Sequence, residues 1–274
     1  AGLWNTFFTS AFFGPFSFSN LVWPLGEFII KKKITFIIND LNVGGTEKQL
    51  FYLIKSIKKY YDIRLFAFNS GRMYDSFSSL NIKLHIGKKS IPGFINLIFF
   101  LLKNKTDLYH FFLPKSYIVG GILTFFSKKK KIMSRRSLNN YHKKYLNISL
   151  FIEKILHKRM QLILTNTGAI KNQLIMEEGI DGSNIKIIKN FIFKKKLSYL
   201  KQKNKNKVKF LYVANFIKYK SHLELIKICS YLNVKKTWEL YLVGSDRDGY
   251  LNKVHNYVVE KKLENNIKFI GEKN

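Results

Sequence analysis

The feature of this sequence that most constrains its fold is an alternation of short apolar runs with helix-forming segments, which begins at Ile34. Apolar runs predict strands at residues 34–39, 62–68, 83–86, 107–112, 131–134, 161–166 and 185–189. Apolar side chains at helical spacing predict helices at residues 46–59, 94–104, 117–127, 145–158 and 168–178. Strands that alternate with helices in this way are typical of an α/β fold with a parallel, doubly wound sheet.

A stretch rich in lysine and asparagine, residues 194–207, is predicted to be a linker that follows a first domain of residues 31–193. The alternation then restarts, with strands predicted at 208–214, 238–243 and 267–270 and helices at 221–232 and 249–262. Three strands and two helices leave one flank of a parallel sheet uncovered. We therefore expect residues 208–274 to be part of a second domain and the chain to end inside it.

The first thirty residues differ from the rest of the chain. They show neither a helical nor a strand period, and the chain has no methionine before Met73. Three lysines followed by an apolar strand, as at residues 31–39, are how many cytosolic proteins begin. Residues 1–30 are thus predicted to be extraneous: upstream sequence, a tag-like extension or a misassigned start. An apolar arm that contacts a membrane is the alternative.

The formal net charge of +31 is a second constraint. A field of this size attracts polyanions such as nucleic acid, anionic lipid head groups or phosphorylated substrates. Lysine beside abundant asparagine, isoleucine and phenylalanine is also what an AT-rich genome encodes, so both explanations stay open. The distribution is more informative, because two long windows contain no Asp or Glu. Residues 108–152 hold nine Lys or Arg, and residues 182–223 hold twelve Lys.

Several classes of protein are disfavoured by what the sequence lacks. The single cysteine, Cys229, excludes an intramolecular disulfide, fits a reducing compartment and is expected to be a buried small side chain. No signal peptide is recognisable, and no apolar run approaches the roughly 20 residues that span a bilayer. Metal-ligand spacing, a serine nucleophile elbow and a catalytic carboxylate pair are also absent. We expect a cytoplasmic protein that needs no metal, with peripheral contact at the cytoplasmic face of the inner membrane left open.

The strongest motif is a pair of glycines, Gly44 and Gly45, between the first strand and the first helix. Glycines let the backbone approach a ligand closely, and the helix N-terminus offers free N–H groups to a phosphate. Thr46 is predicted to cap this helix, with Gln49 as its capping-box partner. A tight structural turn is the alternative for the glycine pair.

Three further segments could carry chemistry. His110 is predicted at the carboxyl end of a strand, where open α/β sheets place their ligand crevice, although a satisfied core histidine is the usual outcome. Lys218 and Lys220 lie between a strand and a helix, in reach of a phosphate, but lysine is common throughout this chain. Gly244 ends another strand, where backbone could lie against a nucleotide.

Taken in order, these segments resemble the retaining GT-B glycosyltransferases of the group 1, family 4 kind over about residues 31–274. In the first domain the resemblance rests on a G-G-x-E segment at Gly44–Glu47, a D-x-x-H strand at Asp107 and His110, an S-x-R strand at Ser134 and Arg136, and the segments Asn166–Thr167 and Ile188–Ile192. In the second domain it rests on a K-G-H-like segment at Lys220, Ser221 and His222 preceded by Asn215, and on Val243–Gly244 and Ile267–Gly271.

The resemblance implies two Rossmann-like domains that face each other across a cleft, with the second domain incomplete here. It implies transfer of a hexose, with retention and without a metal, from a UDP- or GDP-sugar to a glycan or lipid-linked acceptor of cell-surface polysaccharide, lipopolysaccharide or glycolipid synthesis. Gly44, Gly45, Asn215, Lys220 and Gly244 would bind the donor. His110 and Gly45 would serve catalysis, with His110 orienting the reacting sugar. Residues of the first acid-free window would face an anionic membrane or acceptor: Lys128, Lys131, Arg135 and Arg136.

The chain also departs from the family pattern. Asn215 stands where many members have arginine, and the N-G-I-D segment is Asn190–Phe193 here, without glycine or aspartate. The family's pair of glutamates would follow Gly271 by some tens of residues, so we expect little activity from a chain that ends at Asn274. Another GT-B enzyme, such as a nucleotide-sugar epimerase, and a basic protein that binds nucleic acid or a membrane surface are the alternatives. Nucleic acid is not the expected partner, because charge alone suggests it.

Overall fold

The computed structural model describes residues 31–88, 90–138, 147–191, 207–232, 237–246 and 249–273, with backbone only for residues 147–150. The chain divides into two compact units, one up to Phe193 and one from Lys194 onward, here called unit 1 and unit 2. The predicted N-terminal segment 1–30 and all of the predicted linker except Lys207 lie outside the described residues.

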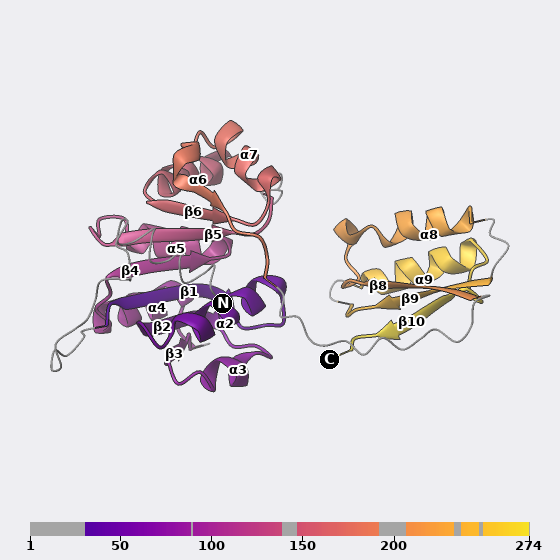
Figure 1. Ribbon diagram of the computed structural model, residues 1–274, viewed down its shortest axis with the longest axis horizontal. Coiled ribbons are helices and arrows are strands. Elements are labelled where there is room, and N and C mark those ends of the chain that lie inside the picture. The colour runs from indigo at the N-terminus through magenta and orange to yellow at the C-terminus, as the bar shows by residue number, and fades with distance from the viewer. Residues whose placement is uncertain are drawn as a thin grey trace, which may run out of the picture. The chain divides into compact units, whose positions relative to one another are not determined.

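Unit 1 is built on a seven-stranded sheet in which all neighbouring strands are parallel (Figure 1). Its strands are β1 (Lys33–Asp40), β2 (Asp62–Asn69), β3 (Lys83–Ile86), β4 (Leu108–Phe112), β5 (Lys130–Arg135), β6 (Leu162–Thr165) and β7 (Ile185–Ile187). Their order is β3-β2-β1-β4-β5-β6-β7, so the winding reverses between β1 and β4. The predicted parallel, doubly wound sheet is confirmed.

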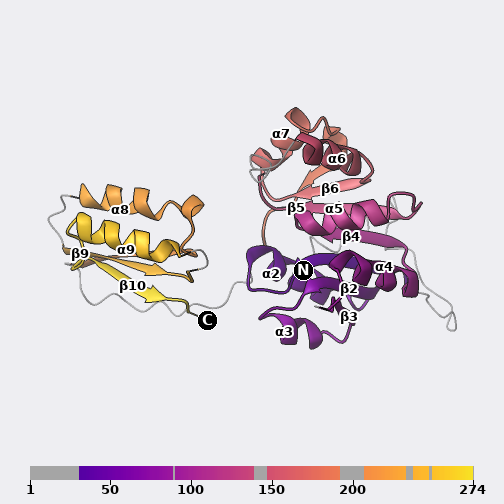
Figure 2. The ribbon, with the colours of Figure 1, turned by 180° about the vertical axis from the view of Figure 1, so that it is seen from behind.

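Helices connect these strands and cover both faces of the sheet (Figure 2). They are α2 (Gly45–Ile57), α3 (Tyr74–Ser78), α4 (Gly93–Lys103), α5 (Pro114–Leu123), α6 (Asn147–Lys158) and α7 (Gly168–Met176). Leu50 of α2 and Phe77 of α3 join the core on one side, here called the α2 face. Leu97 of α4, Tyr117 of α5 and Leu174 of α7 join the core on the other side, here called the α5 face.

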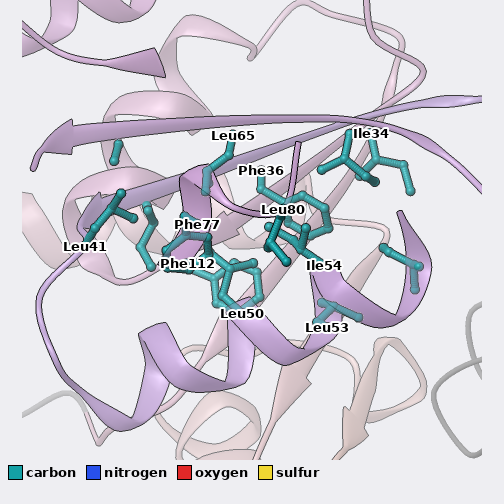
Figure 3. Packing of buried hydrophobic residues seen from close by; sticks show 14 of the residues in the cluster. Ile34, Phe36, Leu41, Leu50, Leu53, Ile54, Leu65, Phe77, Leu80 and Phe112 are labelled. Carbon is teal, nitrogen blue, oxygen red and sulfur yellow. The ribbon is translucent and has the colours of Figure 1, made fainter. Parts of the chain in front are cut away.

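The packing of α2 against the sheet shows why this helix forms where it does (Figure 3). Its apolar side chains recur at the predicted helical spacing, so Leu50, Leu53 and Ile54 all point at the sheet. There they meet Phe36 of β1 and Phe112 of β4, which are fully buried. Burial of such side chains contributes about 1.5–3 kcal/mol each, so this face of the helix holds β1 and β4 together from one side.

The predicted cap of α2 is wrong. The helix begins one residue earlier, at Gly45, and its N-cap is Gly44 in an extended conformation, without a hydrogen bond from a capping side chain. The Gln49 amide is used elsewhere. It donates to the carbonyl of Phe191 at 2.6 Å and accepts from the Phe191 N–H at 2.9 Å. Gln49 thereby satisfies both backbone groups of a residue far away in sequence, which a local capping rule cannot anticipate.

One other helix differs clearly from its prediction, and one is new. Helix α5 begins at Pro114 rather than at residue 117, because proline is favoured in the first turn, where its missing N–H costs no hydrogen bond. Near its end, the Thr124 hydroxyl donates to the Gly120 carbonyl at 2.7 Å. Helix α3 has only five residues, too few to show a helical period in the sequence.

Unit 2 contains a three-stranded parallel sheet of order β10-β9-β8. Its elements are β8 (Lys207–Val213), a 3-10 turn η4 (Lys218–Lys220), α8 (His222–Ser230), β9 (Thr237–Val243), α9 (Tyr250–Glu260) and β10 (Ile267–Gly271). Both helices lie on the same face of the sheet (Figure 1) and form a core with it that includes Cys229, buried as predicted. On the other face, among the described residues, Leu211 and Val213 are 68% and 69% exposed.

A buried ion-pair cluster ties three elements of unit 1 together on the α5 face. Arg135 Nη1, at the end of β5, lies 2.6 Å from Glu178 Oε1, just after α7. His157 Nδ1 of α6 forms a hydrogen bond with the other oxygen, Glu178 Oε2. Burial alone would raise the pKa of Glu178, but hydrogen bonds and charge from His157 and Arg135 more than offset it and lower the pKa.

Replacing Glu178 by glutamine should therefore destabilise unit 1 strongly. Removing one member of a buried ion pair costs about 3–5 kcal/mol. Chemical denaturation at pH 7 would measure this loss. The matched control is Glu177→Gln, since Glu177 is exposed and its neutralisation should cost no more than about 0.5 kcal/mol.

The same variant has a pH signature. A carboxylate whose folded pKa is lowered contributes stability above its ordinary pKa, 4.5 here, and that stability is lost as the pH falls through the lowered value. The stability difference between wild type and Glu178→Gln should therefore be full at pH 7 and shrink below about pH 4.5. A difference that did not change with pH would contradict an ionised Glu178.

Candidate functional site

The first part of the site lies at the carboxyl end of β1, beside the point where the winding of the sheet reverses. The loop after β1 leads through Gly44 and Gly45 into α2. Gly71 packs against this loop. Its Cα is so close to Leu41 that a Cβ would lie 2.3 Å from the Leu41 carbonyl carbon. A Cβ on Gly45, by contrast, would meet nothing within 4 Å. At Gly44, however, a Cβ would lie 2.2 Å from Glu47 Oε2, so the start of α2 is open at Gly45 and covered by the Glu47 carboxylate at Gly44.

A strained residue marks the other side of this reversal. Leu113, between β4 and α5, has φ 73° and ψ 155°, a region that glycine adopts and leucine avoids. The conformation is held by its neighbours: Asn39 Oδ1, near the end of β1, accepts the Ser116 N–H at 3.0 Å. Such strain costs about 1–3 kcal/mol. Backbone strain concentrated where an α/β sheet binds its ligands points to this edge as a functional edge.

His110 lies deeper than predicted. It is the third residue of β4, not at the strand end, and its side chain is fully buried on the α2 face between Phe36 and Phe112. Its Nε2 shares a hydrogen bond of 2.9 Å with Ser134 Oγ on β5. Burial, with the charge of Arg136 adding to it, holds the pKa of His110 well below 6.5. The imidazole is thus neutral near pH 7, and it faces the neighbouring strand rather than solvent.

Two adjacent arginines at the end of β5 point to opposite faces of the sheet. Arg135 belongs to the ion-pair cluster on the α5 face. Arg136 lies on the α2 face, where its Nη1 donates to Asn190 Oδ1 at 2.8 Å. Burial lowers the pKa of Arg136 to about 10, so it stays charged near pH 7. Next to Asn190, the Gln49 amide holds the backbone of Phe191, so that the first half of α2 and the segment after β7 are joined at this edge.

The predicted basic surface of Lys128, Lys131, Arg135 and Arg136 is wrong in two of its members. Arg135 is 2% exposed and Lys131 is 4% exposed. The Lys131 ammonium donates to the Ser127 carbonyl at 2.6 Å, and burial, followed by the charge of Arg159, lowers its pKa. Lys128 is exposed and Arg136 is partly exposed. The sequence could not separate them, because alternate residues of a covered strand turn to different faces.

In unit 2 the predicted residues gather where β8 and β9 end. Gly244 crosses the end of β8 so closely that a Cβ would lie 1.9 Å from the Ala214 carbonyl oxygen. Asn215 Oδ1 accepts the Ser245 hydroxyl at 2.9 Å, so the Asn215 side chain joins the two strand ends. The structure thus brings Asn215 and Gly244 together, and gives Asn215 a structural partner, Ser245, that the sequence did not indicate.

Lys220 ends the 3-10 turn after β8 and is exposed, with Nζ 5.0 Å from the centre of the Tyr219 ring. Ser221 follows it at φ 55° and ψ 38°, in the left-handed region, and is the N-cap of α8. His222 then turns inward and stacks on Phe216, with ring centres 4.7 Å apart. The turn places Lys218 and Lys220 immediately before α8 in the chain, and it has a serine where the K-G-H pattern has glycine.

Some residues of the site were not found from sequence. Asn190 was noted only as part of the segment that lacks the glycine and aspartate of the N-G-I-D pattern, and nothing in the sequence pointed to Leu113. Asn166, after β6, has a buried side-chain oxygen without a hydrogen-bond partner among the described residues.

No group of three or more His, Cys, Asp or Glu side chains that could hold a metal ion occurs in the described ranges. Nor does any described helix have the length and apolar character needed to cross a membrane.

The left-handed Ser221 allows a direct test of this turn. Ser221→Gly should stabilise unit 2 by about 0.5–1 kcal/mol, because glycine adopts positive φ without steric cost. Ser230→Gly is the matched control. It changes the same residue type at the last position of the same helix, where helical φ makes glycine unfavourable, and it should destabilise by a similar amount. Denaturation curves of both variants would show opposite shifts, and a loss of stability in Ser221→Gly would contradict the turn geometry.

Comparisons with known proteins find similarity to glycosyltransferases. The capsular polysaccharide biosynthesis glycosyltransferase CapH of Staphylococcus aureus is 26% identical over 264 residues, which are 88% of this chain and 70% of CapH. The structure of Anabaena HepE in complex with UDP-glucose matches 88% of this chain and 69% of its own, at TM-score 0.69 and 19% identity. The lipopolysaccharide outer core galactosyltransferase WaaB matches 88% of this chain and 68% of its own, at TM-score 0.60 and 18% identity. No protein-family model matches. The two parallel sheets and these structural relatives show that the chain has the GT-B fold, and its sequence is similar to that of a GT-B glycosyltransferase of the group 1-like kind.

Proposed function

We propose that this chain transfers a hexosyl group from a nucleotide sugar, such as a UDP- or GDP-sugar, to a glycan or lipid-linked acceptor, with retention of configuration at the anomeric carbon. The observation that carries the proposal is the joined strand ends of unit 2, with two exposed lysines in the turn that leads into α8. Capsular or lipopolysaccharide synthesis is the proposed setting, supported by what CapH and WaaB are named for.

The donor is proposed to bind at these strand ends of unit 2. The close crossing at Gly244 leaves bare backbone on which a nucleotide can lie. Lys220, and Lys218 with it, would bind the diphosphate, aided by the free N–H groups at the start of α8. Asn215 would act on the donor through Ser245, because its side-chain oxygen is already engaged there.

During transfer, the acceptor hydroxyl oxygen forms a bond to the anomeric carbon while the bond from that carbon to the diphosphate breaks. The diphosphate leaves with the bonding electron pair, and the hydroxyl proton passes to a phosphate oxygen. The negative charge that develops on the leaving group is stabilised by the lysines and the helix dipole. In unit 1, Gly44 and Gly45 at the start of α2 would face an anionic part of the substrate. His110 would act indirectly, because its hydrogen bond to the buried Ser134 helps fix the strand ends that the sugar approaches.

Binding of UDP-sugars tests the donor assignment. Lys220→Gln should weaken UDP-glucose about tenfold in isothermal titration, because one charge-assisted hydrogen bond to phosphate is lost. Lys227→Gln is the matched control, since it removes the same charge from the opposite end of α8 and should leave the affinity unchanged. If a panel of UDP- and GDP-sugars produced no binding to the wild-type chain, the donor assignment would fail.

We also propose that one surface of unit 1 rests on an anionic membrane. Its apolar part consists of Ile122, Phe126, Phe151, Ile152 and Ile155, all exposed, with Phe126 at 94%. These side chains come from α5, the turn after it, and α6. The two helices pack together, since a Cβ on Gly121 of α5 would lie 3.4 Å from Leu156 Cδ1 of α6. Exposed Lys128–Lys130 border the apolar part. We call this the α5–α6 surface, and its mixture of aromatic and basic side chains suits the interface of an anionic bilayer.

Co-sedimentation with vesicles tests this contact. Lys128→Gln/Lys129→Gln should weaken binding to vesicles of mixed neutral and anionic phospholipid about ten- to thirtyfold, at about 1 kcal/mol per lysine near the surface. Lys55→Gln/Lys59→Gln is the control, because these exposed lysines belong to the α2 side of the sheet. Vesicle binding that did not depend on salt concentration or on the content of anionic lipid would reject a membrane contact on this surface.

A further inference from the structure

The two acid-free windows of the sequence meet at one place in unit 1. Arg136 belongs to residues 108–152 and Asn190 to residues 182–223, and neither window contains Asp or Glu. The structure joins them, with Arg136 Nη1 donating to Asn190 Oδ1 at 2.8 Å. This contact brings the two acid-free windows together at the carboxyl edge of β5 to β7, where Arg136 supplies a positive charge.

The Arg136 guanidinium is a desolvated cation without a counter-ion in the described part of the chain. Its described hydrogen bond goes to a neutral amide, and its Nε is buried with no acceptor. The nearest undescribed stretches, residues 139–146 and 192–206, belong to the acid-free windows and contain no carboxylate. A largely desolvated cation of this kind is stabilised when an anion binds it.

The two arginines of unit 1 that are buried, Arg135 and Arg64, provide the comparison. Arg135 is paired with Glu178 at 2.6 Å, and Arg64 lies 3.3 Å from Asp62. Arg136 differs from both because its described partner, the Asn190 amide, carries no charge. Asn190 is also exposed, so a ligand can reach the guanidinium from solvent.

The surroundings of Arg136 are fixed rather than adaptable. Ser134, on the same face of β5, is bonded to His110, and the Gln49 amide binds both backbone groups of Phe191, next to Asn190. A planar guanidinium held in this way offers a fork of N–H donors that matches a phosphate or carboxylate.

We propose that Arg136 anchors an oxyanion site for a phosphate group of one of the two substrates. The site rests on the proposed transferase function and assigns it a phosphorylated ligand at unit 1. The phosphate can belong to the acceptor, as in a lipid diphosphate-linked sugar, or to the donor, and the two sources are separable by experiment.

Isothermal titration of the full chain with three probes tests the site: inorganic pyrophosphate, UDP, and a short-chain alkyl diphosphate sugar. Arg136→Gln should weaken the probe that uses the site about 10- to 100-fold, because a charge-assisted pair of hydrogen bonds is lost. Arg136→Lys should recover only part of the affinity, since an ammonium lacks the fork. Lys83→Gln, an equal change of charge on β3 at the far edge of the sheet, should have no effect.

Thermal unfolding separates a binding role from a structural one. If Arg136 forms a ligand site, Arg136→Gln without phosphate should unfold at the same temperature as wild type or higher. The increase in unfolding temperature that pyrophosphate causes should then be smaller in the variant than in wild type. A structural role predicts a lower unfolding temperature and an unchanged rise, which would overturn the site.

Each titration outcome is decisive. Weaker binding of the alkyl diphosphate sugar supports the site with the acceptor as the phosphate source, and weaker binding of UDP supports it with the donor. Unchanged affinity for all three probes overturns the site while the transferase function stands. If wild type binds no UDP, the transferase function fails, and the pyrophosphate comparison still decides whether Arg136 holds an oxyanion.

Discussion

Parallel pairing of every strand is the constraint on which the rest of the structure depends. A parallel strand cannot return through a tight turn, so the chain crosses over after each strand and collects all strand ends at one edge of each sheet. This gathering explains where the candidate residues of both units lie. Gly44 and Arg136 come just after strands of unit 1, and Asn215 and Gly244 just after strands of unit 2. The reversal between β1 and β4 then opens the edge of unit 1 at the strained Leu113.

The two-residue period of a strand decides which basic residues are structural and which face a ligand. Arg135 and Arg136 are neighbours in the chain, yet one is neutralised by Glu178 under α6 and α7, and the other reaches Asn190 on the α2 face. The same alternation sets Lys131 under the α5 face, where a backbone carbonyl holds it. A basic segment that looks uniform in sequence is thus divided into an internal support, a proposed ligand contact and an exposed rim at Lys128.

The net charge of the chain can be interpreted only after its structural basic residues are separated from those that face a ligand or solvent. Much of the lysine excess lies on solvated faces, where a positive side chain costs little and says little about partners. The informative positions are those where charge is desolvated or joined to exposed apolar groups. Arg136 is of the first kind, and the lysines beside Phe126 on the α5–α6 surface are of the second. Selection for an anionic partner is best sought at these places.

The sequence by itself determined the architecture of this protein. Its periodicity is a local property, so strands and helices were predicted within two residues almost everywhere, and the ordered motifs placed Gly44, Lys220 and Gly244 at strand ends. Tertiary structure alone decided the contacts between distant segments. Gln49 binds Phe191 instead of capping α2, His110 lies in the core rather than at the strand end, and Arg136 forms a hydrogen bond with Asn190. These contacts depend on which strands lie side by side and which face each residue takes, and no local pattern contains that information.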